Sequence, residues 1–123
     1  MKSETKVEDQ FREMNSSERA MMARLFEDSF PGAEQLVAQI KNCLVRSIDE
    51  NGSLDFIVPL DKKASVHNSV PVEAEAEDVD GVTIHILLHV IEGIARGIEV
   101  YKEDLSRVIL FPAPAELRLF SPP

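Results

Sequence analysis

The chain has 123 residues and a formal net charge of −9, from 22 acidic against 13 basic residues. Its content of 44% hydrophobic and 28% charged residues is typical of one soluble globular domain with a core of its own. Nucleic acids and anionic membranes are bound by clustered Lys and Arg, and the sequence offers no cluster beyond the pair Lys62-Lys63. We therefore expect neither as a partner, whereas an acidic surface favours a basic protein.

The single cysteine, Cys43, excludes an internal disulfide and suits a reducing compartment. The first residues are polar and of mixed charge, unlike a signal peptide, and no apolar run is long enough to span a membrane. We therefore expect a cytoplasmic protein. Residues 1–14 are predicted to form a flexible N-terminal segment, and residues 15–123 a single α+β domain.

Two short helices are predicted at the start of that domain. Asn15 and Glu18 have the spacing of a capping box, and apolar residues then recur at helical spacing as far as Phe26. The corner Phe30-Pro31-Gly32 interrupts this pattern, and a second apolar stripe runs from residue 33 to residue 40.

After the helices, the sequence changes to the two-residue repeat of strands. Short connections favour antiparallel neighbours. Strands are predicted at residues 44–48, 54–58, 70–77, 82–90, 97–102 and 107–111, followed by a short docking segment with Leu117, Leu119 and Phe120. The expected fold class is α+β, with the two N-terminal helices packed on one face of an antiparallel sheet of five or six strands.

The predicted strand at 70–77 carries a row of acidic residues. Glu73, Glu75 and Glu77 alternate with small apolar residues, and the following turn adds Asp78 and Asp80 without any basic residue. Like charges on one strand repel each other, so stability alone does not require such a row. Two interpretations stay open: a binding surface for a basic partner, or charge that protects an exposed edge strand from aggregation.

The next two predicted strands hold a second set of candidates. His85 and His89 lie about 13 Å apart along one strand, which is too far for two ligands of one zinc ion, so we expect no metal site. His89 is a candidate general base if Glu99 or Glu92 orients it, and His89, Glu99 and Tyr101 would form a sheet-lined pocket. The glycines are scattered singly rather than gathered in a phosphate-binding loop, and we expect no cofactor.

Four short motifs resemble a family of small bacterial proteins classed as a domain of unknown function. They are FPGAEQL at 30–36, VPVEAE at 70–75, LLHV at 87–90 and IEVY at 98–101. The resemblance covers about residues 16–114 and implies an α+β fold and a bacterial origin, without an activity that can be transferred. The chain has Asp104-Leu105 where that family usually has Asp-Gly.

Small size, acidity and the lack of a catalytic motif favour a non-enzymatic protein-binding module. An immunity-type protein, which neutralises a basic toxin such as a nuclease through an acidic face, fits these features. Two other hypotheses stay open. One is a small enzyme or ligand-binding protein that uses His89, Glu99 and Tyr101, and the other is a homo-oligomer formed through an exposed strand.

Overall fold

The computed structural model describes residues 11–59 and 62–122. Most of the predicted flexible segment, residues 1–10, lies outside the described residues. The backbone of Arg12 is bridged to Val45, and Met14 is buried in the core. The packed part of the chain therefore already includes Arg12 and Met14, on the N-terminal side of the first helix. Helix α1 (Ser16–Leu25) and helix α2 (Ala33–Lys41) follow, as predicted from the apolar stripes.

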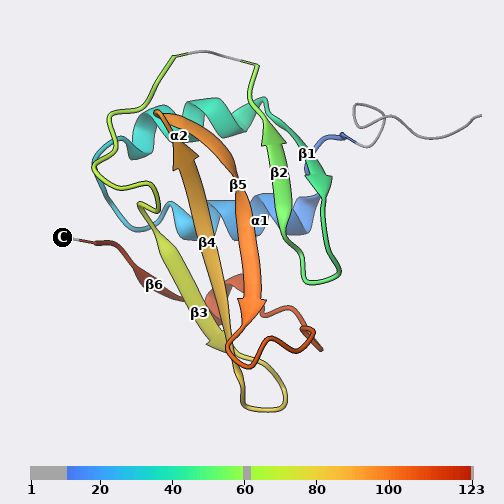
Figure 1. The fold of residues 1–123 in the computed structure, drawn as a ribbon. Coiled ribbons are helices and arrows are strands. Elements are labelled where there is room, and N and C mark those ends of the chain that lie inside the picture. The colour runs from blue at the N-terminus through green and yellow to red at the C-terminus, as the bar shows by residue number, and fades with distance from the viewer. Residues whose placement is uncertain (1–10, 60–61, 123) are drawn as a thin grey trace, which may run out of the picture.

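Six strands form one antiparallel sheet in the order β1-β2-β5-β4-β3-β6. Both helices lie behind the sheet in the view of Figure 1, so they cover one of its faces. The predicted α+β fold is confirmed. The strand bounds are β1 Leu44–Ser47, β2 Leu54–Ile57, β3 Glu73–Glu77, β4 Thr83–Ile91, β5 Ile94–Lys102 and β6 Arg118–Phe120.

The core lies between the helices and the sheet face that they cover. Every second residue of β4 is buried there, from Ile84 to Val90, and faces buried helix residues such as Leu25 and Leu36. This two-residue alternation is the reason that one face of the sheet is apolar and the other is polar. Gln39 of α2 fastens the two layers, because its buried amide accepts from the backbone N–H of Ala95 at 2.8 Å. In the described part of the chain, no helix is long and apolar enough to cross a membrane.

Local signals explain how the elements begin and turn. The predicted capping box of α1 is confirmed: the Asn15 side chain accepts from the Glu18 N–H at 2.8 Å, and the Glu18 carboxylate accepts from the Asn15 N–H at 3.0 Å. Strand β5 begins at Ile94, earlier than the predicted residue 97. The reason is the two-residue turn Glu92-Gly93, in which both residues have positive φ as in a tight hairpin.

The strand predicted at residues 107–111 is wrong, because side chains occupy the backbone donors that a ladder would need. The N–H of Val108 donates to Asn51, and those of Ile109 and Leu110 donate to Asp78. The sixth strand is instead the short segment predicted to dock at the end, Arg118–Phe120, which pairs with β3. Since β3 therefore lies between β4 and β6, its acidic row does not protect an exposed edge.

Candidate functional site

The sheet face opposite the helices, which we call the outer face, carries most of the polar side chains of the strands, together with the exposed Leu44, Ile57 and Phe120. On β3 these residues are Glu73, Glu75 and Glu77, and the register places Glu75 opposite His85 of β4, which in turn lies opposite Tyr101 of β5. The predicted acidic row therefore points away from the core. His85 and His89 share this face, as the strand period predicted.

Arg118 of β6 compensates part of the acidic row. Its guanidinium donates to both carboxylate oxygens of Glu77, at 2.9 and 2.7 Å, and to Glu75 at 3.3 Å. The hydrogen bond from Arg118 lowers the pKa of Glu77, and the two carboxylates raise the pKa of Arg118. The row is thus a fixed ion-pair network at its β6 side, and not a line of free charges.

His85 joins the acidic row to the neighbouring strands. Its ring stacks on Tyr101 with centroids 4.9 Å apart, Nε2 lies 3.2 Å from Glu103 and Nδ1 lies 3.7 Å from Glu75. Residues from β3, β4 and β5 are held against one another by this cluster. The imidazole lies between two carboxylates, and this arrangement limits its rotation.

Asp78 and Asp80 occupy a different environment from the row. The side chains of Asp78 and Lys102 are fully buried, with 3.1 Å between Oδ2 and Nζ, and Asp80 reaches the same ammonium group at 2.7 Å from the surface. Asp78 therefore does not face an incoming partner, and the predicted binding set is reduced at the surface to the three glutamates and Asp80. The hydrogen bond from Lys102 lowers the pKa of Asp80, and the same contact raises the pKa of Lys102.

Asp78 is a structural anchor rather than a surface charge. Burial alone would raise the pKa of this carboxyl, but hydrogen bonds from the backbone N–H groups of Ile109, Val79 and Leu110 and from the Lys102 ammonium outweigh it. The net effect is a pKa below the ordinary range, so the carboxylate stays ionised. Four donors on one carboxylate join three segments of the chain.

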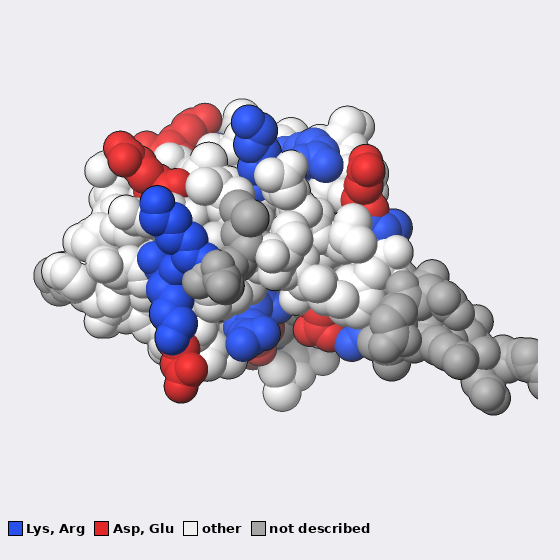
Figure 2. All heavy atoms as spheres, turned by 90° about the horizontal axis from the view of Figure 1, so that it is seen from above, with Lys and Arg blue, Asp and Glu red and all other residues white. Residues whose placement is uncertain are grey.

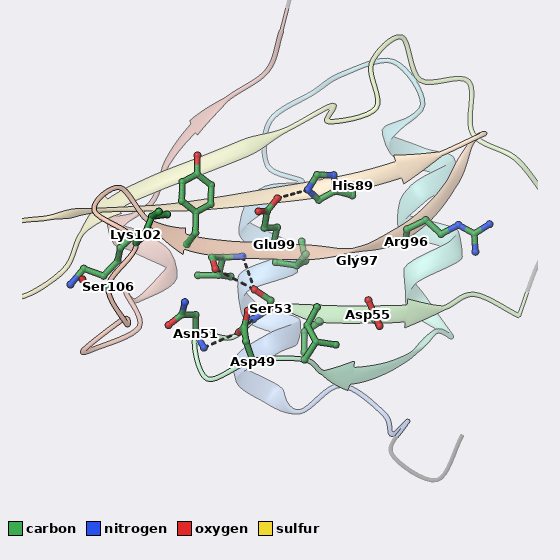
Figure 3. Close-up of a pocket in the computed structure, with 16 residues that line it drawn as sticks. Asp49, Asn51, Ser53, Asp55, His89, Arg96, Gly97, Glu99, Lys102 and Ser106 are labelled. Atoms are coloured by element: carbon green, nitrogen blue, oxygen red, sulfur yellow. Dashed lines mark hydrogen bonds and ion pairs between the residues drawn. The ribbon is translucent and has the colours of Figure 1, made fainter. Parts of the chain in front are cut away.

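The three residues of the predicted pocket do come together, along an open groove of about 660 Å³ on the outer face. His89 Nε2 and Glu99 Oε1 are 2.8 Å apart, and Tyr101 lines the same groove. Figure 3 shows this pair on one side of the groove and Asp49 and Asn51, from the β1–β2 turn, on the other. The groove is open to solvent along the sheet, so it does not enclose a ligand.

Gly97 makes the floor of the groove possible. A Cβ atom at this position would lie 2.3 Å from the backbone oxygen of Leu54, which is less than any non-bonded contact permits. Strands β2 and β5 pair only through Leu54–Ile98 and Asp55–Gly97, so a side chain there would force them apart.

Two kinds of chemistry find no support in the part of the chain that the structure describes. Among residues 11–59 and 62–122, no three His, Cys, Asp or Glu side chains are arranged to hold a metal ion. Cys43 is buried, and burial raises the pKa of its thiol to about 11, so the reactive thiolate is scarce at neutral pH.

Fold and surface define a small α+β protein with one sheet face covered by two helices and the other face open. Residues 11–112 match the model of the family described as Domain of unknown function (DUF6984), and the chain belongs to this family. The family resemblance inferred from the sequence is thereby confirmed. Comparisons with curated proteins and with solved structures gave no match.

Sequence reasoning missed the two basic residues that organise these surfaces, Lys102 and Arg118. A signal for Lys102 existed, since it shares the buried side of β5 with Ile98 and Val100, where a charge requires a buried partner. Arg118 gave no such signal, because its pairing with Glu77 depends on a strand order that brings the last strand beside β3.

Proposed function

We propose that the protein is a non-enzymatic protein-binding module of the bacterial cytoplasm, which binds a basic partner through its outer face. The observation that carries the proposal is the row Glu73, Glu75 and Glu77 on a sheet face that both helices leave uncovered. The specific form of the proposal is an immunity-type protein that neutralises a basic toxin, such as a nuclease. Fixed carboxylates speed the association with a cationic surface and reject acidic competitors.

The charge balance of the outer face supports a basic partner. The row is joined on this face by two further acidic side chains, Asp55 and Glu99, while the basic side chains along it are Arg46, Arg96 and Arg118. Each Arg that pairs with a carboxylate also fixes its rotamer, so less side-chain entropy is lost when a partner binds.

The test is a variant that inverts the charge of the acidic row and keeps its ion pairing with residue 118, E73K/E75K/E77K/R118E. Its probe is the product of the adjacent gene, produced recombinantly, because toxins and their neutralising proteins act as pairs. We expect binding of a basic product to fall by about tenfold or more, and the wild-type affinity to fall with added salt. The control R118E/E77K swaps one ion pair and leaves the net charge unchanged. Equal affinity of the inverted variant would contradict the proposal.

A second candidate function is a small ligand-binding protein or enzyme. The observation that favours it is the His89–Glu99 hydrogen bond at the wall of the groove that Tyr101 also lines. A carboxylate that orients an imidazole is the arrangement of a general base. A thermal-shift screen of small metabolites against wild type and H89Q tests it: a stabilising compound that depends on His89 supports this candidate, and shifts that are equal in both proteins contradict it.

A further inference from the structure

A second surface lies where β5 ends and where β3 turns into β4. It consists of three loops, residues 48–53, 78–82 and 103–111, which we call the loop end. The 103–111 loop lies between the other two: Arg107 pairs with Glu50 of the first, and Ile109 donates to Asp78 of the second. Figure 1 shows these loops together at the bottom of the sheet, away from α2.

Exposed apolar side chains concentrate at the loop end. The described residues include eleven large hydrophobic side chains that are exposed, and six of them lie in these three loops. The six are Ile48, Val79, Leu105, Ile109, Leu110 and Phe111. Ile48 and Leu105 line the groove of the outer face, whereas Ile109 and Phe111 line a separate hollow beside the start of α1. Single exposed apolar residues are normal on any surface, but their density in three neighbouring loops favours a contact site.

The same loops are held in place by hydrogen bonds that do not involve those side chains. Asp78 accepts from the N–H groups of Ile109 at 2.6 Å and Leu110 at 3.0 Å, and Asn51 accepts from Val108 at 2.9 Å. The backbone is therefore fixed while the side chains of Ile109 and Leu110 remain about 60% exposed. An apolar surface that is already ordered loses little conformational entropy on binding.

The rim of the loop end is acidic. Five exposed carboxylates belong to its loops, from Asp49, Glu50, Asp80, Glu103 and Asp104, against the single exposed base Arg107. The opposite end of the molecule differs, since Figure 2 shows Lys and Arg side chains beside acidic and uncharged ones there. A symmetric dimer through the loop end would bring two acidic rims together, which disfavours a second copy as the occupant.

We infer that the loop end is the main contact surface for a protein partner that presents apolar side chains flanked by Lys or Arg. The inference rests on the proposed protein-binding function and names where the largest part of the binding energy arises. The two surfaces are continuous, because Ile48, Asp49 and Leu105 of the loop end also line the groove that holds His89 and Glu99. An apolar centre with a charged rim is the common anatomy of a protein interface.

The test uses the full chain and a phage-displayed library of random dodecapeptides as the probe. We expect the selected peptides to be rich in aromatic or aliphatic residues next to Lys and Arg. Their affinity should fall about tenfold or more in I109S/L110S, whose backbone contacts to Asp78 do not depend on the replaced side chains. The control V37S removes an exposed apolar side chain from α2, on the side of the sheet away from the outer face, and should change the affinity less than about twofold.

The outcomes separate the inference from the function on which it rests. Basic, apolar peptides that bind I109S/L110S as tightly as wild type, but lose affinity for the inverted variant E73K/E75K/E77K/R118E, would overturn the loop end and leave the proposed function standing. Selection of acidic peptides, or of none, would overturn both. Self-association of the wild type in sedimentation, abolished by I109S/L110S, would assign the loop end to a second copy and would also overturn the inference.

Discussion

The outer face and the loop end differ in the burial of the ion pair that organises each of them. On the outer face the ion pairs lie in solvent, as in Arg118 with Glu77, where both side chains are about half exposed. At the loop end, the side chains of Lys102 and Asp78 are fully buried. Pairs in water contribute little to stability and can change without cost to the fold, whereas a buried pair that loses one member leaves an uncompensated charge. The outer face therefore suits the recognition of a charged partner, and the loop end suits the presentation of exposed side chains on a fixed backbone.

The largest expected effect is that of D78N, which tests whether the loop end depends on one carboxylate. In the wild type, four donors share the two carboxylate oxygens of Asp78, whereas the amide of Asn offers them only one acceptor oxygen. The substitution also leaves Lys102 without its buried counter-charge. We expect the melting temperature to fall by about 10 °C or more, measured by circular dichroism. The matched control E73Q, on the outer face, should leave it within about 2 °C. Equal melting temperatures for D78N and wild type would contradict this description of the loop end.

K102M makes the same comparison from the other side of the pair. It removes the ammonium group, but Asp78 keeps its three backbone donors, from Val79, Ile109 and Leu110. We therefore expect a smaller loss than in D78N, of about half as many degrees. A greater loss in K102M than in D78N would mean that the ion pair, and not the backbone hydrogen bonds, stabilises the loops.

Low pH should destabilise the loop end as D78N does, because protonation removes the negative charge of Asp78. The folded-state pKa values of Asp78 and Asp80 lie below the ordinary 3.8, so the unfolded chain binds more protons and stability increases with pH in this range. The stabilisation is complete above that ordinary value and is lost as the pH falls through the folded values. Lys102, whose pKa is raised above 10.5, loses its contribution only in strong alkali.

The measurement is urea unfolding at neutral pH and about one unit below the ordinary Asp pKa. Wild type should lose more stability between the two conditions than D78N, which lacks the main titrating group of the loop end. The variant E73Q should retain the wild-type difference. If D78N and wild type lost the same stability, the acid sensitivity would arise elsewhere in the chain.

The comparison also separates what the sequence predicts well from what it does not. Alternation along β3 and β4 predicted both the sheet and the outward direction of Glu73, Glu75 and Glu77, because the period of a strand is a local property. The run at 107–111 has the same apolar character but is a loop. Its conformation is set by Asp78, about thirty residues earlier, and no local pattern records such a contact.

The candidate sites follow the same division. His89 and Glu99 come together although the hairpin register differs from the prediction. The predicted connection between the two strands would place residue 99 beside residue 89, but the turn at Glu92-Gly93 places Gly97 opposite His89 and Leu87 opposite Glu99, so the hydrogen bond runs diagonally from β4 to β5. The burial of Asp78 was not predictable from its place in an acidic turn. It depends on Lys102, which reaches it from the strand two positions later in chain order. The alternation of residues within one strand thus predicts which side chains share a sheet face. Contacts between segments that are distant in the sequence decide which of the charged side chains are exposed to solvent.

A smaller effect is expected for R118A on the outer face. Losing Arg118 frees Glu75 and Glu77, but all three side chains contact water, so solvent replaces most of the interaction. We expect the melting temperature to fall by less than about 3 °C, and the difference from wild type to disappear at high salt. The affinity for a basic partner should increase, because two carboxylates are released. If R118A lowered the melting temperature as much as D78N, the ion pairs of the outer face would also be needed for the stability of the fold.

The smallest effect is expected for the His89–Glu99 pair, where the two interpretations of the groove diverge. Both side chains are substantially exposed, 40% and 52%, so a double-mutant cycle with H89Q and E99Q should give a coupling within about 0.5 kcal/mol in urea unfolding. A pair this weak is not retained by the fold for stability. If the cycle instead gave several times that value, the hydrogen bond would be part of the β4–β5 scaffold. If the coupling is small and H89Q also leaves peptide affinity unchanged, the groove would be separate from the partner surface, and the ligand-binding hypothesis would be its remaining explanation.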